Sequence, residues 1–153
     1  RLDKQAPGAV PPAPTWGTPD AEECLRRDYA GRHVLLVEDE LISQEIARGL
    51  LEEVKMNDDL AQDGLEALDM ARHTAYDLIL MDMLLPKMSG IEATRVIRQI
   101  PGRENTPIIA LTANSFDEDR NECIAAGMNG HIGKPVIPEA LFESLLEWLP
   151  VTN

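Results

Sequence analysis

Residues 78–82 have the sequence Leu78-Ile79-Leu80-Met81-Asp82, four large apolar side chains followed by an acid. A run this short and this continuously apolar predicts a strand that is buried on both faces of a sheet. Similar runs occupy residues 33–37, 107–111 and 131–132, and the polar segment 55–62 predicts a weaker strand. Each of these five segments is followed by a stretch in which apolar residues recur at helical spacing.

The alternation of five strands with five helices predicts an α/β fold. We expect the helices near residues 41–51, 65–71, 91–100, 115–126 and 141–148. Strands joined by helices in this way form a parallel sheet with helices on both faces, which is a doubly wound three-layer sandwich. Functional residues of such sheets collect at the carboxyl ends of the strands.

The composition fits one globular domain preceded by a linker. The chain has 153 residues, which is enough for one domain with a sizeable core and too few for two. Five of the 11 prolines fall within residues 7–19, so residues 1–31 are predicted to be a Pro/Ala-rich linker with at most a short helical turn at 22–29. Residues 32–150 are predicted to form the domain. Because the chain begins with Arg1, we expect it to be a piece of a longer protein.

Charge and cysteine usage limit the classes of partner. The net charge of -13 repels nucleic-acid phosphates and anionic lipid, so direct nucleic-acid binding is not expected. No segment approaches the roughly 18 apolar residues of a membrane span, so no membrane contact by this fragment is expected. Cys24 and Cys123 form no metal-binding or redox pattern, which favours reduced thiols in a cytoplasmic protein.

Polar residues stand at the carboxyl ends of four predicted strands. Glu38 and Asp39 follow the first, Asp82 ends the third, Thr112 ends the fourth and Lys134 comes just after the fifth. Each residue type is common in turns and caps, but one sheet edge can bring all five to one pocket. Three close carboxylates favour a hard cation such as Mg²⁺. A carboxylate beside that cation can attack phosphorus, and an ammonium and a hydroxyl can help to neutralise the transferred phosphoryl group.

Residues 32 to about 150 resemble the receiver domain of response regulators, which is the CheY-like family. The motifs that carry this resemblance are Val34–Asp39, Asp77–Met83, Pro86 with Gly90, Ile109–Asn114 and Lys134-Pro135. Together they are specific and span about four fifths of the chain. The resemblance implies a flavodoxin/CheY-like parallel sheet with strand order 2-1-3-4-5.

The resemblance also assigns roles within the pocket. It implies that Asp82 is the phosphoacceptor, and that Glu38, Asp39, Asp82 and the backbone carbonyl of Met83 hold Mg²⁺. Thr112 would respond to the phosphoryl group as a switch residue, and Lys134 would form an ion pair with it. Phosphorylation would then shift a face built from the fourth helix, the fifth strand and the fifth helix.

Two segments are most similar to the receivers of hybrid sensor histidine kinases, namely residues 111–114 and 127–136. This resemblance implies a bacterial two-component phosphorelay. The expected partner is a histidine kinase core or a histidine-containing phosphotransfer protein. The expected location is cytoplasmic, in a parent protein that could itself be membrane-anchored.

Three other functions use related features. A phosphatase of the haloacid dehalogenase type also has an Asp at a strand end, but its second Asp, two residues later, is replaced here by Leu84. A docking module that is independent of phosphorylation would not need Asp82, Thr112 and Lys134 together. Flavin binding would need a phosphate-binding loop after the first strand, where Glu38-Asp39-Glu40 would repel a phosphate.

One position departs from the receiver pattern. Three residues before the lysine, the family commonly has Tyr or Phe as a switch residue, and this chain has His131. The simpler interpretation is that the imidazole fills the same half-exposed space. The alternative hypothesis is that switching is weaker or depends on pH, since histidine titrates near neutrality.

Overall fold

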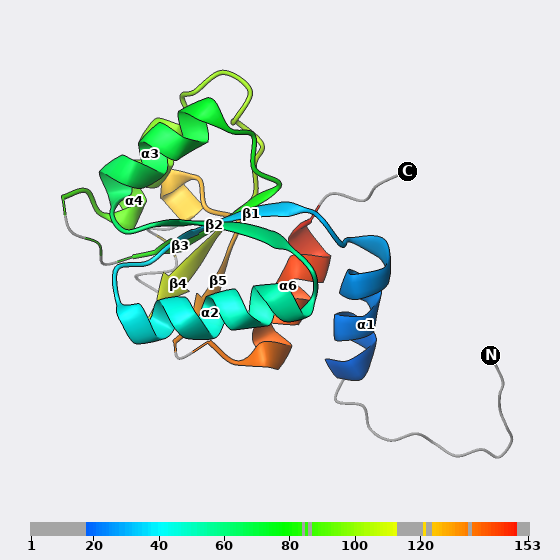
Figure 1. The fold of residues 1–153 in the computed structure, drawn as a ribbon. Helices are drawn as coiled ribbons and strands as arrows, with labels where there is room; N and C mark the ends of the chain where they lie inside the picture. The colour runs from blue at the N-terminus through cyan, green and yellow to red at the C-terminus, as the bar shows by residue number, and fades with distance from the viewer. Residues whose placement is uncertain are drawn as a thin grey trace, which may run out of the picture.

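The computed structural model describes residues 18–83, 85, 87–112, 121, 124–134 and 136–149. Its five strands form one parallel sheet with the order β2-β1-β3-β4-β5, as predicted (Figure 1). The strands are β1 His33–Val37, β2 Asn57–Ala61, β3 Leu78–Asp82, β4 Ile108–Thr112 and β5 Gly130–Gly133. The weak polar segment therefore becomes β2, which lies at an edge of the sheet.

Helices cover both faces of the sheet. They are α1 Thr18–Asp28, α2 Leu41–Glu53, α3 Gly64–His73, α4 Gly90–Ile97 and α6 Pro138–Trp148. Figure 1 shows α2 and α6 on one face and α3 with α4 on the other. The helix predicted at 115–126 lies mostly outside the described residues, although residues 124–126 are helical.

Alternate residues of the strands feed two separate cores. Val34 and Leu36 of β1 pack with α1, α2 and α6, whereas Leu35 and Val37 pack with α3 and α4. All five residues of β3 and of β4 are buried. This explains the continuously apolar runs, because successive side chains of a strand point to opposite faces and both faces are covered here.

The segment before β1 differs from the predicted linker. Residues 18–28 form the helix α1, which is longer than the turn expected at 22–29. Ala21 and Leu25 of α1 are buried in the core on the α2 and α6 face, and Figure 1 shows α1 beside α6. The two residues are four apart and so lie on one side of the helix, where α6 supplies the surface that buries them.

Helix α2 forms where predicted, and its buried face does not include its first two apolar residues. Leu41 and Ile42 are 68% and 67% exposed. The side chains buried along the helix are those of Gln44, Ala47 and Leu51. A polar residue therefore begins the buried face, and two large apolar residues remain at the surface beside the carboxyl end of β1.

No helix in the described part of the chain is long and apolar enough to span a membrane.

Candidate functional site

The pairing of the strands brings the five predicted site residues to one edge of the sheet. Val37 pairs with Met81, so the residues that follow β1 lie beside Asp82 at the end of β3. On the other side, Thr112 pairs with Gly133, directly before Lys134. The amide of Lys134 also donates to the carbonyl oxygen of Thr112 at 2.9 Å.

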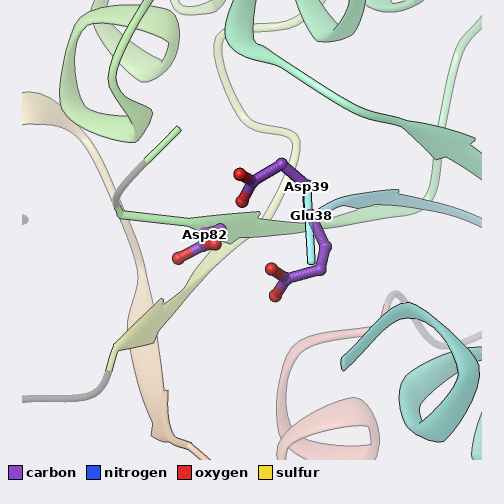
Figure 2. A group of neighbouring side chains, drawn as sticks. All are labelled: Glu38, Asp39 and Asp82. Carbon is purple, nitrogen blue, oxygen red and sulfur yellow. The ribbon is translucent and has the colours of Figure 1, made fainter. Parts of the chain in front are cut away.

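Three carboxyl groups meet at this edge. One oxygen from each of Glu38, Asp39 and Asp82 lies within 4.8 Å of the other two. Figure 2 shows the three side chains turned toward a common space beside the ends of β1 and β3. Glu38 is only 1% exposed and Asp82 4%, whereas Asp39 is exposed. Two of the three acids are therefore largely removed from water.

Lys134 approaches two of these acids. Its Nζ lies 2.9 Å from Glu38 Oε1 and 3.2 Å from Asp82 Oδ2. The contact with Asp82 is a hydrogen bond, while the contact with Glu38 is an ion pair without hydrogen-bond alignment. The Lys134 ammonium thus forms ion pairs with two carboxylates.

The electrostatics of the cluster follow from burial. Burial raises the pKa of Glu38 to about 7, with Lys134 lowering it and Asp82 raising it further. Burial alone would lower the pKa of Lys134, but Glu38 and Asp82 outweigh that effect and raise it above the ordinary value for lysine. Ionisation of all three carboxyls would place more negative charge here than this one ammonium balances, and a divalent cation would relieve the excess.

The start of α4 fixes the backbone around Asp82. A Cβ atom on Gly90 would collide with the carbonyl oxygen of Asp82, so this close approach requires glycine. Ser89 and Glu92 form a capping box, in which each side chain accepts from the other residue's backbone N–H. The Met83 carbonyl accepts from the Gly90 amide at 3.2 Å, and a carbonyl oxygen has a second lone pair for a further partner.

The donor set suits magnesium. All the candidate ligand atoms are oxygens, and Mg²⁺ binds carboxylate and carbonyl oxygens while keeping several waters. The residues that would hold it are Glu38, Asp39, Asp82 and, through its backbone, Met83.

Thr112 lies next to the acidic cluster, whereas His131 lies away from it. Thr112 is buried at the end of β4, next to the strand that carries Asp82. His131 lies on β5 and lines a cavity of about 420 Å³ together with Trp148 and Met128. None of the other predicted site residues lines that cavity, so the structure separates His131 from the acidic cluster.

A family model for the response regulator receiver domain matches residues 34–146. The chain belongs to the response regulator receiver domain family. Its class of function is that of a phosphoacceptor in phosphorelay signalling. The phosphatase and docking-module alternatives gain no support from this match.

Curated relatives of this receiver are histidine kinases. Probable histidine kinase 1 of Oryza sativa subsp. indica is 36% identical over 148 residues, which cover 76% of this chain and 15% of the relative. The signal transduction histidine-protein kinase BarA of Escherichia coli strain K12 is 34% identical over 117 residues, which cover 76% of this chain and 13% of that protein. The chain thus spans about one seventh of the length of these curated relatives.

Solved receiver structures share the fold. The receiver domain of the sensor histidine kinase PA1611 from Pseudomonas aeruginosa PAO1, with a magnesium ion in its active-site cleft, has a TM-score of 0.74 and 40% identity over 78% of this chain and 98% of that one. The Ssk1 receiver of Saccharomyces cerevisiae, crystallised with the histidine phosphotransfer protein Ypd1, gives a TM-score of 0.73 and 33% identity. That match covers 78% of this chain and 89% of the matched chain.

Two features of the site were not predicted. The capping box at the start of α4 is one, although Ser89-Gly90-Ile91-Glu92 has the Ser-x-x-Glu spacing that indicates it. Gln44 is the other, because nothing in the sequence distinguishes it from the other polar residues of the helix at 41–51. The structure places its side chain on the backbone of Glu38.

Proposed function

We propose that this receiver is phosphorylated on Asp82 in a magnesium-dependent reaction. The observation that carries the proposal is the group of three converging carboxyls with Lys134 Nζ at 3.2 Å from Asp82 Oδ2. Glu38 and Asp82 are both buried beside the ammonium, but only the Asp82 carboxyl accepts a hydrogen bond from it, which supports Asp82 as the attacking group and Lys134 as the group that receives the new phosphoryl oxygens.

The transfer exchanges one bond to phosphorus for another. A carboxylate oxygen of Asp82 attacks the phosphorus of a phosphohistidine, the P–O bond forms, and the P–N bond to the leaving imidazole breaks. Bound Mg²⁺ would neutralise charge on the transferred group. Lys134 stabilises the same charge from the other side, and its Nζ moves from Glu38 toward the phosphoryl oxygens. The Thr112 hydroxyl follows as a hydrogen-bond donor.

The donor must reach a residue that is only 4% exposed, so it has to cover the rim of the pocket. The described rim is apolar on one side, where Leu41 and Ile42 of α2 follow directly after the acidic turn. Ile137, at the start of α6 just past Lys134, is also exposed. We infer that these three side chains meet the helix that carries the phosphohistidine of a histidine kinase core or phosphotransfer protein.

The histidine kinases among the relatives support a proposal for the wider setting. We propose that the chain is the receiver of a hybrid sensor histidine kinase in a bacterial phosphorelay, located in the cytoplasm. The folded unit would begin at α1, near residue 18, and extend to about residue 150, with residues 1–17 as the linker.

His131 carries a smaller proposal. We infer that the imidazole on β5 makes the response of this face to phosphorylation weaker than the Tyr or Phe that the family commonly has there. A His131→Tyr variant should therefore gain more affinity for a phosphorylation-dependent partner when it is phosphorylated. An equal gain in both proteins would contradict the hypothesis.

The central test is a mass measurement. The domain is incubated with acetyl phosphate and Mg²⁺, and its intact mass is followed. We expect a phosphate-sized gain that requires the cation and that is lost in Asp82→Asn. The control is Asp69→Asn, because Asp69 is exposed on α3 and its loss should leave the gain unchanged. A gain that persists in Asp82→Asn would overturn the assignment.

A further inference from the structure

Gln44 is a buried polar residue that the phosphorylation chemistry does not use. It is 6% exposed, on the inner face of α2, one turn after the acidic residues. Its Nε2 donates to the backbone carbonyl oxygen of Glu38 at 2.7 Å. This hydrogen bond joins α2 to the residue that carries the most deeply buried carboxyl of the cluster.

The Glu38 carbonyl needs this partner because of its place in the fold. The ladder of β1 ends at Val37, one residue earlier. The Glu38 amide still donates to the Ala61 carbonyl at 3.0 Å, but the carbonyl on the other side of the residue lies past the sheet. A buried carbonyl left without a donor destabilises the fold. The Gln44 carboxamide supplies the donor, so Glu38 is fixed through both of its backbone groups.

The side chain of Glu38 is held by fewer hydrogen bonds than its backbone. Its Oε2 accepts from the Glu40 amide at 3.1 Å, and its Oε1 faces Lys134. Within the described residues, the side chain of Glu40 makes no capping bond to the backbone of α2, although it accepts from the Ser43 hydroxyl at 2.8 Å. When Lys134 turns to the phosphoryl group, Glu38 loses its cationic neighbour and depends on the turn that Gln44 and the Glu40 amide hold.

We propose that Gln44 is a positioning residue for the magnesium site. Its hydrogen bond to the Glu38 carbonyl keeps the turn from Glu38 to Glu40 in the conformation in which Glu38 and Asp39 face Asp82. This inference rests on the proposed function, since it assumes that these carboxylates bind the cation. Gln44 touches neither the cation nor the phosphoryl group, so it acts on cation affinity and not on the transfer step itself.

The expected signature is a change in magnesium affinity with little change in maximal rate. In Gln44→Met, a change of similar volume that removes the donor, we expect Mg²⁺ to bind about tenfold more weakly, as is typical when a group that orients a ligand is lost. Acetyl phosphate should label the variant slowly at low Mg²⁺ and at nearly the wild-type rate at saturating Mg²⁺. Calorimetric titration with Mg²⁺ alone measures the affinity without any phosphorylation.

The matched control is Gln99→Met, since Gln99 is exposed near the end of α4. It should leave Mg²⁺ affinity and labelling unchanged. Equal Mg²⁺ affinity in Gln44→Met and wild type would overturn the inference. So would a loss of rate that saturating Mg²⁺ does not restore.

A measurement on the wild-type protein covers the case in which Gln44→Met folds poorly. The side-chain amide signals of Gln44 in a nitrogen-15 NMR spectrum should be shifted from the values of exposed glutamines and should move during Mg²⁺ titration. Signals that stay at exposed values throughout would contradict the proposal. If acetyl phosphate phosphorylates the wild-type protein and Gln44→Met binds Mg²⁺ normally, this inference alone fails. If the wild-type protein is not phosphorylated but its Mg²⁺ affinity falls in Gln44→Met, only the phosphorylation proposal fails.

Discussion

Both ends of the sheet carry acidic residues close together, but the carboxyls at the two ends have different partners. At the amino end, Asp59 accepts from the Tyr76 hydroxyl at 2.8 Å and lies 3.0 Å from His33 Nε2, and Asp77 accepts from the His33 amide at 2.8 Å. At the carboxyl end, Glu38, Asp39 and Asp82 converge on one another, and the described residues bring them a single ammonium, that of Lys134.

The difference separates acids that stabilise the fold from acids that do chemistry. Each carboxyl at the amino end faces donors from neighbouring segments, so its charge is used within the structure. Asp58 on the same edge strand is also paired, with Arg48 at 2.7 Å, and its side chain is only 6% exposed. The carboxyl end keeps an excess of negative charge, which is the condition for binding an external cation.

The largest effect on the difference between the two ends should come from removing Lys134. In Lys134→Met we expect the metal-free protein to lose about 3 kcal/mol of unfolding free energy, because two buried carboxylates lose their cation. Labelling by acetyl phosphate should fall by about a hundredfold, because one stabilising group of the transition state is gone. Urea unfolding and labelling rates measure the two effects.

The control for this change is Lys87→Met. Lys87 is 64% exposed and pairs only loosely with Asp63 at 3.5 Å, so its loss should cost less than about 1 kcal/mol. Mg²⁺ should stabilise Lys134→Met more than wild type, since the cation can take over part of the ammonium's role. Equal stability losses for the two lysine variants would show that Lys134 stabilises the carboxylates at the carboxyl end no more than Lys87 stabilises Asp63 at the surface.

A second test of the charge at the carboxyl end is to vary the pH in the absence of metal. Glu38 has a pKa of about 7 in the fold against 4.5 for an ordinary glutamate, so the folded protein retains this proton longer than the unfolded chain. Unfolding free energy should therefore fall as pH rises from about 4.5 to about 7, by at most about 3 kcal/mol. Urea unfolding across this range measures the slope.

Glu38→Gln isolates the source of that slope. The amide cannot ionise, so the loss of stability between pH 4.5 and 7 should largely disappear. Saturating Mg²⁺ should flatten the wild-type profile as well, because it favours the ionised carboxyl. A slope that survives in both cases would place its origin outside the acidic cluster.

The fold and the position of the site could be read from sequence for one shared reason. Strands β1, β3 and β4 are buried on both faces, so their apolar runs are continuous, and the polar residue that ends each run marks the edge of the sheet. Asp82 and Thr112 end such strands and Glu38 directly follows one, so their convergence needed only the parallel topology.

The parts that sequence did not predict depend on partners that are distant along the chain. Leu25 makes α1 part of the core only because α6, at the far end of the chain, supplies a surface for it. Leu41 and Ile42 are large apolar residues of α2 that stay exposed, whereas its buried face begins at Gln44, whose partner is a backbone carbonyl. Spacing reports periodicity and not which face has a neighbour.

The smallest expected effect tests the amino end directly. In Asp59→Asn we expect a stability loss of about 1 kcal/mol, because an amide oxygen accepts a weaker hydrogen bond from the Tyr76 hydroxyl than the carboxylate does. Burial, together with Asp59, raises the pKa of Tyr76 to about 12, so this pKa should fall toward 10 in the variant. Spectroscopic titration in a Tyr29→Phe background reports Tyr76 alone, since the chain has two tyrosines. Mg²⁺ affinity and labelling should remain at wild-type values, and a change in either would mean that the two ends of the sheet are coupled.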